Sequence, residues 1–288
     1  MDKKYILLAP EAIFPITKND KGITINNTPS TGFKISGTIQ GEGKMAGIPV
    51  LFIRTSRCNL RCIWNLPDGQ VSMCDTPYTS FDIANELKLS VEKLKKIILN
   101  NLGNINHLVI SGGEPLLQSE NISFLISELD KERKIHYSVE TNGTIYNEKL
   151  IEKIDFFSIS PKLKNSVPTI EKIKKQNITV NSDIDYLEKI RLNTDVIQSI
   201  IDHCRENKDK DFQLKFVVQN HDEIKEIEDS FLSRLSGWKP DDIVLMPLGS
   251  TPEELKQTRM LTVELAIERG WRFSPRLQIN YFGGIAGV

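Results

Sequence analysis

The sequence has few cysteines, no long hydrophobic run and no excess of charge of either sign. Its 4 cysteines in 288 residues are too few for a disulfide scaffold. The longest apolar runs, such as residues 48–53, are much shorter than the roughly 18 residues that a membrane-spanning helix needs. Because 37 Lys and Arg nearly balance 38 Asp and Glu, the net charge is −1. This balance gives no electrostatic reason to expect nucleic acid or a membrane as a partner.

The N-terminal segment also lacks the features of a secretory signal. Its apolar stretch, residues 6–9, is too short for a signal-peptide core and is followed by Pro10 and Glu11. We therefore expect a cytoplasmic, reducing environment, in which clustered cysteines are more often metal ligands or redox groups than disulfides.

What the sequence does contain is a regular alternation of short apolar runs and longer helical patterns. Helical patterns with one apolar face occupy residues 90–101 and 119–132, and Thr251-Pro252 is a typical helix start. This alternation predicts an α/β fold whose parallel sheet is built from βαβ units. The strand-like runs are residues 50–54, 107–111, 134–141, 155–160, 212–218 and 242–248.

Two regions interrupt the alternation. Residues 10–35 are rich in turn-forming residues, which predicts a loop or a hairpin lying on the core. Residues 162–210 are polar, lysine-rich and helical in pattern. We interpret them as a helical insertion and not as a separate domain.

Three of the four cysteines, Cys58, Cys62 and Cys74, are close together in the sequence. The Pro-Asp-Gly sequence at 67–69 supplies a turn that can bring the third thiol back to the first two. Three ligands on one short segment leave a further metal position open for a bound molecule. The spacing alone does not separate zinc, with Cys204 as a fourth ligand, from an iron–sulfur cluster. It also leaves open that these are buried cysteines without a metal.

Polar motifs follow the predicted strands downstream of the cysteines. They are Ser-Gly-Gly-Glu-Pro-Leu-Leu-Gln at 111–118, Glu-Thr-Asn-Gly at 140–143 and Ser-Ile-Ser-Pro-Lys at 158–162. A glycine pair at the end of a strand lets a ligand approach the backbone closely. Because the active sites of β/α barrels form at the carboxyl ends of parallel strands, these motifs predict a catalytic site there.

Together, the cysteines and these motifs resemble the radical S-adenosylmethionine (SAM) enzymes, in which three cysteines hold a 4Fe–4S cluster. Within that superfamily the chain resembles the 7-carboxy-7-deazaguanine synthase family. The resemblance is dense at 38–43, 52–64, 74–76, 111–118, 140–143 and 158–162, and sparser at 246–249 and 274–283.

The resemblance implies one domain over residues 1–288, a partial TIM-like β/α barrel of the radical SAM type with an N-terminal extension. The cluster, SAM and substrate core would cover about 33–162, a helical insertion 163–211, and the rest of the barrel with a substrate-closing tail 212–288.

The chain departs from the family in the cysteine segment. The usual pattern continues as Cys-Asn-Leu-Arg-Cys-x-Trp-Cys-Asp-Thr, but here Asn65 follows Trp64 and the third cysteine is delayed to Cys74. We interpret residues 65–73 as an inserted loop, because Asp75 and Thr76 still follow the third cysteine.

The resemblance also implies roles for individual residues. Cys58, Cys62 and Cys74 would hold the cluster, Thr76 would bind Mg²⁺, and Arg54 would pair with the substrate carboxylate, to which a planar guanidinium is suited. The remaining substrate contacts would come from Ile39, Gln40, Gly41, Glu42, Ser111 and Arg276. Cofactor contacts would come from Asp75, Gly112, Gly113, Glu114, Glu140, Thr141, Asn142, Ser160, Pro161 and Lys162.

The implied reaction converts 6-carboxy-5,6,7,8-tetrahydropterin to 7-carboxy-7-deazaguanine, a precursor of 7-deazapurine nucleosides such as queuosine or archaeosine. One electron from the reduced cluster would cleave SAM, and the resulting radical would take a hydrogen atom from carbon 6 of the pterin. The ring would then contract with loss of ammonia.

The resemblance further implies a homodimer, a Mg²⁺ requirement and a one-electron reductant of the flavodoxin or ferredoxin type. Two alternatives remain at this point. One is a different radical SAM enzyme, either an activase or a peptide-modifying enzyme. The other is a structural zinc module that uses all four cysteines.

Overall fold

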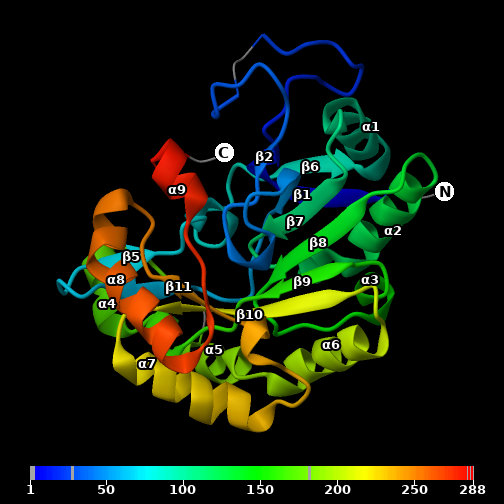
Figure 1. Ribbon diagram of the computed structural model, residues 1–288. Helices are drawn as coiled ribbons and strands as arrows, with labels where there is room; N and C mark the ends of the chain where they lie inside the picture. The colour runs from blue at the N-terminus through cyan, green and yellow to red at the C-terminus, as the bar shows by residue number, and fades with distance from the viewer. Residues whose placement is uncertain (1–3, 27–28, 181–182, 284, 286, 288) are drawn as a thin grey trace.

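The computed structural model describes residues 4–26, 29–180, 183–283, 285 and 287. Helices cover the outer face of one large mixed sheet (Figure 1). The strands are β1 (Tyr5–Phe14), β2 (Thr38–Ile39), β3 (Pro49–Thr55), β4 (Ile63–Asn65), β5 (Val71–Met73), β6 (Leu87–Ser90), β7 (His107–Gly112), β8 (His136–Thr141), β9 (Phe156–Ile159), β10 (Asp211–Val218), β11 (Ile243–Pro247) and β12 (Arg272–Phe273). The α-helices are α1 (Val91–Leu102), α2 (Ser119–Asp130), α3 (Glu148–Ile151), α4 (Ile170–Gln176), α5 (Ile184–Arg191), α6 (Thr194–Glu206), α7 (His221–Glu226), α8 (Pro252–Arg269) and α9 (Leu277–Phe282).

Most of the sheet is parallel. Strands β3, β7, β8, β9, β10, β11 and β12 pair in that order, each parallel to the next. The outermost strands, β12 and β6, do not pair with each other in the described part of the chain. The sheet is therefore open, and the expected incomplete β/α barrel is confirmed.

The other edge of the sheet is antiparallel and includes residues that the sequence did not identify as a strand. β1 lies between β3 and β6 and pairs antiparallel with both. The prediction of a loop over 10–35 is thus wrong for residues 10–14. Pro10 obscured this strand, because proline is rare inside sheets, and the structure accommodates it at a register shift between Leu8 and Ile13.

Successive residues of the inner strands face opposite sides, as a β-strand requires. In β3, Ile53 belongs to the apolar core beneath the helices, whereas Arg54 lines a central cavity. In β10, Phe216 is in the core and Lys215 lines the cavity. The apolar runs therefore build a helix-covered layer on one face, and the polar residues among them build the wall of a site on the other.

The predicted helices are present. Helix α1 buries Val91, Leu94, Ile97 and Ile98, and the Thr251 side chain accepts a hydrogen bond from the backbone N–H of Glu254 at the start of α8. No helix among the described residues is both long and apolar enough to cross a lipid bilayer.

The region 163–211 is helical as expected, but its helices have different surroundings. Helix α6 makes the crossover between β9 and β10 and contributes Ile197, Ile200 and Ile201 to the main core. Helix α5 instead packs through Leu187 on Leu60 and Cys62 of the cysteine segment. Within the described part of 163–211, only the helices before α6 thus pack against the segment that carries the clustered cysteines.

Candidate active site

A cavity of about 660 Å³ opens at the carboxyl ends of the parallel strands. Most of the residues that the sequence singled out line it. They are Ile39, Gln40, Gly41, Glu42, Arg54, Cys58, Cys62, Cys74, Asp75, Thr76, Ser111, Gly112, Gly113, Glu140, Thr141, Asn142, Ser160, Lys162 and Arg276. Glu114 and Pro161 do not belong to this lining.

The three clustered cysteines meet at one side of the cavity because of a β-hairpin. Cys62 directly precedes β4 and Cys74 directly follows β5, and these two strands pair antiparallel. The backbone N–H of Cys74 donates to the carbonyl oxygen of Cys62 at 3.1 Å. The inserted residues 65–73 are therefore mostly a hairpin that returns the third cysteine to the second.

Burial raises the pKa of the cysteine thiols. The pKa of Cys58 is raised to about 12, by burial first and by the nearby Glu114 second. Burial likewise raises the pKa of Cys62, the charge of Lys162 lowers it, and negative charge on Cys74 or Cys58 raises it. Such thiols bind metal only by losing their protons, which a positively charged metal group promotes.

Cys204 is not part of this group. It lies in α6, buried within the main apolar core, and it does not line the cavity. In the described part of the chain, no three His, Cys, Asp or Glu side chains are arranged to hold one metal ion. The four-cysteine zinc site is therefore not formed. Three thiols facing an open cavity fit an iron–sulfur cluster, because such a cluster spreads its ligands over several iron atoms.

Gly113 allows the end of β7 to approach the cysteine segment closely. A Cβ atom at this position would lie 2.2 Å from the carbonyl oxygen of Arg57 and 2.9 Å from Cβ of Cys58. The backbone N–H of the next residue, Glu114, donates to that same carbonyl oxygen at 2.9 Å. Any side chain at 113 would displace the segment that carries the first cysteine.

The side chain of Glu114 joins two strand ends and does not face the cavity. Its carboxylate accepts hydrogen bonds from the backbone N–H of Asn142 at 2.8 Å and the Thr141 hydroxyl at 2.9 Å. Glu114 is fully buried, and burial raises its pKa. These hydrogen bonds hold the 141–142 turn, and the expected cofactor contact of Glu114 stays a prediction.

Arg54 brings a positive charge into the cavity, where it helps to lower the pKa of Asp75 but forms no hydrogen bond to a described residue through its Nε. Its guanidinium lies over the ring of Phe14, with Cζ 4.8 Å from the ring centroid. Its Nε is buried and has no hydrogen-bond partner among the described residues. A buried charged donor without a partner is costly, so this geometry suits an anionic ligand in the cavity.

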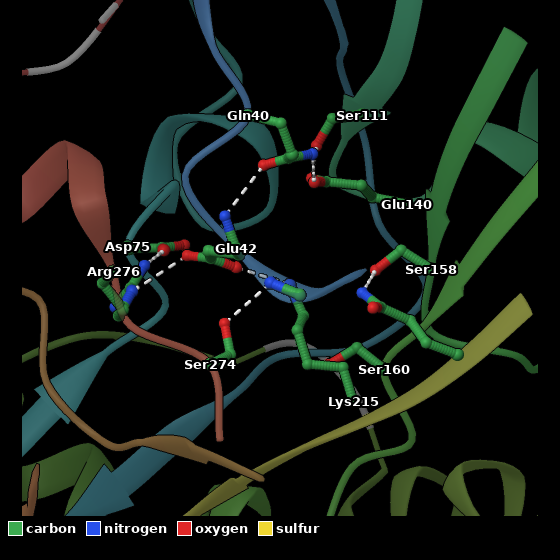
Figure 2. Close-up of polar contacts among 12 residues, drawn as sticks. Gln40, Glu42, Asp75, Ser111, Glu140, Ser158, Ser160, Lys215, Ser274 and Arg276 are labelled. Atoms are coloured by element: carbon green, nitrogen blue, oxygen red, sulfur yellow. Dashed lines mark hydrogen bonds and ion pairs between the residues drawn. The ribbon is translucent and has the colours of Figure 1, made fainter. Parts of the chain in front are cut away.

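Gln40, Ser111 and Glu140 form a connected group in the cavity wall (Figure 2). Both oxygens of the Glu140 carboxylate accept hydrogen bonds, one from the Gln40 amide at 3.0 Å and one from the Ser111 hydroxyl at 2.6 Å. This carboxylate of β8 is thus fixed in orientation by two residues, Ser111 in β7 and Gln40 just after β2. On the cysteine side, the Lys162 ammonium donates to the Ser160 hydroxyl at 2.8 Å.

A second group links the N-terminal part of the chain to the C-terminal segment. Figure 2 shows Glu42 between Lys215 on one side and Arg276 on the other, with the Asp75 carboxylate beside Glu42 and also facing Arg276. The Lys215 ammonium is 2.5 Å from Glu42, and the Arg276 guanidinium is 2.9 Å from Glu42 and 2.6 Å from Asp75. Arg276 also donates to the carbonyl oxygen of Gly249.

These contacts determine the charge states of the group. Burial by itself raises the pKa of Glu42, but the charges of Lys215 and Arg276 more than offset it and hold that pKa well below the usual range. Burial by itself lowers the pKa of Lys215, whereas Glu42 raises it above the usual lysine value. All members of the group are therefore ionised near neutral pH.

Sequence reasoning missed Lys215 and Gln278, which both line the cavity. Gln278 donates to Glu42 at 2.6 Å. The only signal for Lys215 was a single lysine inside an otherwise apolar strand run, which marks the side of the strand that faces the cavity.

Comparisons with known proteins agree with this geometry. A family model described as the radical SAM superfamily matches residues 52–230. The chain is 35% identical over 249 residues to 7-carboxy-7-deazaguanine synthase of Halobacterium salinarum, covering 84% of this chain and 86% of that protein. It is 32% identical over 253 residues to the protein of the same name from Rhodopirellula baltica, covering 86% and 85%.

The fold is similar to the crystal structure of QueE from Escherichia coli, with a TM-score of 0.53 and 22% identity, covering 91% of this chain and 93% of that one. The family model covers more than half of the chain, and the curated relatives align along most of their length. The chain therefore belongs to the radical SAM superfamily and, within it, to the 7-carboxy-7-deazaguanine synthase family.

Proposed function

We propose that the chain converts 6-carboxy-5,6,7,8-tetrahydropterin to 7-carboxy-7-deazaguanine in 7-deazapurine biosynthesis. Its relatives carry the name of that product's synthase. The observation on this molecule that supports the proposal best is Arg54, a partly buried cation in the same cavity as the three cysteines, whose Nε has no hydrogen-bond partner among the described residues. A carboxylated substrate supplies the missing anion, and a guanidinium can bind both of its oxygens.

The cysteine side of the cavity fits a 4Fe–4S cluster that binds SAM. When bound, the cluster and SAM supply the one-electron chemistry that starts a radical reaction on the substrate. The chain's part is to hold Cys58, Cys62 and Cys74 together and to shield the reaction from water. Several apolar side chains contribute to that shield, namely Phe14, Phe52, Leu60, Met246 and Leu248.

For the substrate, we assign the binding face to the residues around Arg54. Gln40 and Ser111 hold the Glu140 carboxylate in one orientation, which prepares it to accept a hydrogen bond from the pterin ring. The 39–42 segment completes this side, with Ile39 and Gly41 in the wall. Arg276 is fully engaged with Glu42, Asp75 and Gly249, so we assign it to fixing the closing segment and not to direct substrate contact.

For SAM, we assign the binding face to the strand ends beside the cysteines. Gly112 and Gly113 offer backbone there, and Thr141, Asn142, Ser160 and Lys162 offer polar side chains. Glu114 contributes indirectly, because it holds the 141–142 turn.

We propose a Mg²⁺ ion bound at Thr76. The Thr76 side chain lines the cavity next to Cys74, with its hydroxyl 3.4 Å from the Cys74 sulfur. The neighbouring Asp75 is paired with Arg276. Mg²⁺ at this point would thus be held by one neutral oxygen, with substrate oxygens and water completing its octahedral shell.

The setting of the reaction is also a proposal. We expect the protein to act in the cytoplasm as a homodimer and to receive its electron from a carrier of the flavodoxin or ferredoxin type. The net charge of −1 suits an enzyme that handles the small-molecule precursor without binding nucleic acid.

Anaerobic reconstitution followed by turnover tests this function. The reconstituted protein is incubated with SAM, a reductant and the carboxypterin, with and without Mg²⁺, and the products are separated by chromatography. We expect 7-carboxy-7-deazaguanine, with a higher rate when Mg²⁺ is present. SAM cleavage without this product would indicate a different radical SAM substrate. Bound zinc without sulfide would contradict the cluster itself.

A further inference from the structure

Two segments lie on the cysteine side of the cavity, the β4–β5 hairpin and the helical segment that begins at η4 (Lys164–Ser166) and continues into α4. We propose that η4 and α4 act as a clamp that holds the hairpin and thereby positions Cys74 as the third cluster ligand, with Asn165 and Gln176 as the positioning residues. This inference rests on the proposed function only for the presence of the 4Fe–4S cluster.

The hairpin needs such support. It has only three residue pairs, Ile63–Met73, Trp64–Ser72 and Asn65–Val71. It forms a sheet of its own and does not join the large sheet. Two-stranded hairpins are marginally stable alone in water. Strand pairing therefore fixes Cys74 relative to Cys62, but it does not fix either of them relative to Cys58.

The clamp contacts both strands of the hairpin through side-chain amides. Asn165 accepts from the backbone N–H of Asn65 at 3.1 Å and donates to the carbonyl oxygen of the same residue at 3.2 Å. It thus pairs with the end of β4 much as a neighbouring strand would. Gln176 donates to the carbonyl oxygen of Val71 in β5 at 2.7 Å and lines the cavity itself.

The clamp is rigid because η4 and α4 are joined by a buried lysine. The Lys172 ammonium donates to the carbonyl oxygens of Asn165 at 2.6 Å and Val167 at 2.9 Å. Only 3% of Lys172 is exposed. A buried ammonium that satisfies two backbone acceptors ties Asn165 to the helix that carries Gln176.

Helix α8 holds the opposite side of the hairpin. Gln257 donates to the Asp68 carboxylate at 3.0 Å, and the Ser72 hydroxyl donates to Glu254 at 3.4 Å. In Figure 1, β5 lies beside both α4 and α8. Contacts from α4 and α8, which lie far from Cys74 in the sequence, therefore hold the hairpin that carries this third cysteine.

Substitution of the clamp residues tests this inference. Gln176→Met keeps the length of the side chain but removes the donor, and Asn165→Leu removes both bonds to Asn65. Lys174→Met is a matched control on α4, because Lys174 is exposed and its side chain makes no hydrogen bond to the hairpin in the described part of the chain. Gln176→Lys restores a donor of similar reach.

Each protein is reconstituted anaerobically. We then measure iron and sulfide per chain, the rate of iron release to a chelator and the electron paramagnetic resonance spectrum of the reduced cluster. We expect roughly tenfold faster iron release for Gln176→Met, since a lost hydrogen bond of about 1 to 1.5 kcal/mol corresponds to about that factor, and a larger increase for Asn165→Leu, which loses two bonds. We also expect an altered spectrum for both. Lys174→Met should match the parent, and Gln176→Lys should recover most of the retention.

Parent-like iron release and spectra in both clamp variants would overturn the inference. So would faster release that merely follows a lower melting temperature of the metal-free protein, since that would be a general loss of stability. The substrate assignment is separate: if the clamp variants behave as expected but the carboxypterin is not converted, only the proposed reaction fails.

Discussion

At the scale of single residues, the cavity is defined by which of its charges are paired. Glu42, Asp75, Lys215 and Arg276 neutralise one another. Arg54 acts on Asp75 only through its charge, and its buried Nε has no hydrogen-bond partner among the described residues. The paired charges therefore build the wall, whereas Arg54 and Lys162 form no ion pair among the described residues and are left to bind ligands. This difference gives a specific expectation for Arg54.

Arg54→Ala should weaken binding of the carboxypterin by roughly 10- to 100-fold, because charged hydrogen bonds contribute about 1.5 to 3 kcal/mol. Arg54→Lys should fall between Ala and the parent, since an ammonium keeps the charge but cannot form the two parallel bonds. Anaerobic calorimetry of substrate binding measures this. Cluster content should be unchanged in both variants, and equal substrate affinity in all three proteins would remove Arg54 from the carboxylate role.

The cysteines allow a second residue-scale prediction. Cys74→Ala should prevent assembly of a complete cluster, because Cys74 is the thiol that the hairpin brings back to Cys62. Cys204→Ala should assemble a normal cluster and lose only about 1 kcal/mol of stability from a small void in the core. Iron and sulfide analysis together with denaturant titration checks both. Normal iron content in the Cys74 variant would show that the third ligand lies elsewhere.

At the scale of elements, ion pairs attach the C-terminal segment that leads into α9 to two N-terminal residues, Glu42 and Asp75. Arg276 joins Glu42 and Asp75, and the backbone N–H of Leu277 donates to the carbonyl oxygen of Gly41 at 3.1 Å. A Cβ atom at Gly41 would lie 2.0 Å from the Gln278 side chain. A side chain at position 41 would therefore displace the Gln278 amide, which donates to Glu42.

Arg276→Gln should lower the free energy of unfolding by about 2 kcal/mol, since it removes the charged hydrogen bonds to buried Glu42 and half-exposed Asp75 while Glu42 keeps Lys215. The double variant Glu42→Gln/Arg276→Gln should lose less than the sum of the two single variants, because each single change already breaks the pair. Urea unfolding of the metal-free proteins gives these values. Additive effects would show that Glu42 and Arg276 contribute independently.

The pH dependence of this pair follows from the lowered pKa of Glu42. A carboxyl group whose folded pKa is lowered stabilises the fold above its unfolded pKa, near 4.5, and loses that contribution as the pH falls toward the folded value. The coupling between Glu42 and Arg276 should therefore be constant from neutral pH down to about pH 5.

At the scale of the whole molecule, the two ends of the parallel strands serve different purposes. The carboxyl ends carry the cavity, whereas the amino ends of β7 and β8 carry His107 and His136 opposite each other. The two rings lie with centroids 4.4 Å apart, and His107 contacts the Ser138 hydroxyl. Burial first, and His136 second, lowers the pKa of His107 to about 4.

This pair predicts acid sensitivity of the fold that does not involve the active site. His107 is neutral in the folded protein but takes up a proton on unfolding below its ordinary pKa of about 6.5. Its contribution to stability is therefore complete above pH 6.5 and is lost as the pH falls toward 4, at up to about 1.4 kcal/mol per pH unit. Urea titrations of the parent and His107→Gln between pH 7 and 5 should show a shallower slope for the variant; equal slopes would contradict the assignment.

The sequence predicted the parallel strands and the main helices because these depend on local patterns, and most of the site residues that it singled out line the cavity. Apolar runs mark strands, and polar motifs at strand ends mark the site. The same reasoning failed at β1, where Pro10 hid a strand that a bulge accommodates. A motif also shows which residues gather at a site but not which way each side chain points, and the hydrogen bonds of Glu114 to the 141–142 turn were not predicted.

The order of the elements, the three-plus-one division of the cysteines and the family were thus determined by the sequence alone, since chemistry and periodicity are written residue by residue. Only the tertiary structure decided that residues 65–73 form a hairpin held by α4 and α8, that Lys215 and Arg276 meet at Glu42, and that the buried Nε of Arg54 has no hydrogen-bond partner among the described residues. These features depend on contacts between residues more than 90 positions apart. Such contacts exist only once the sheet has folded and brought the strand ends together.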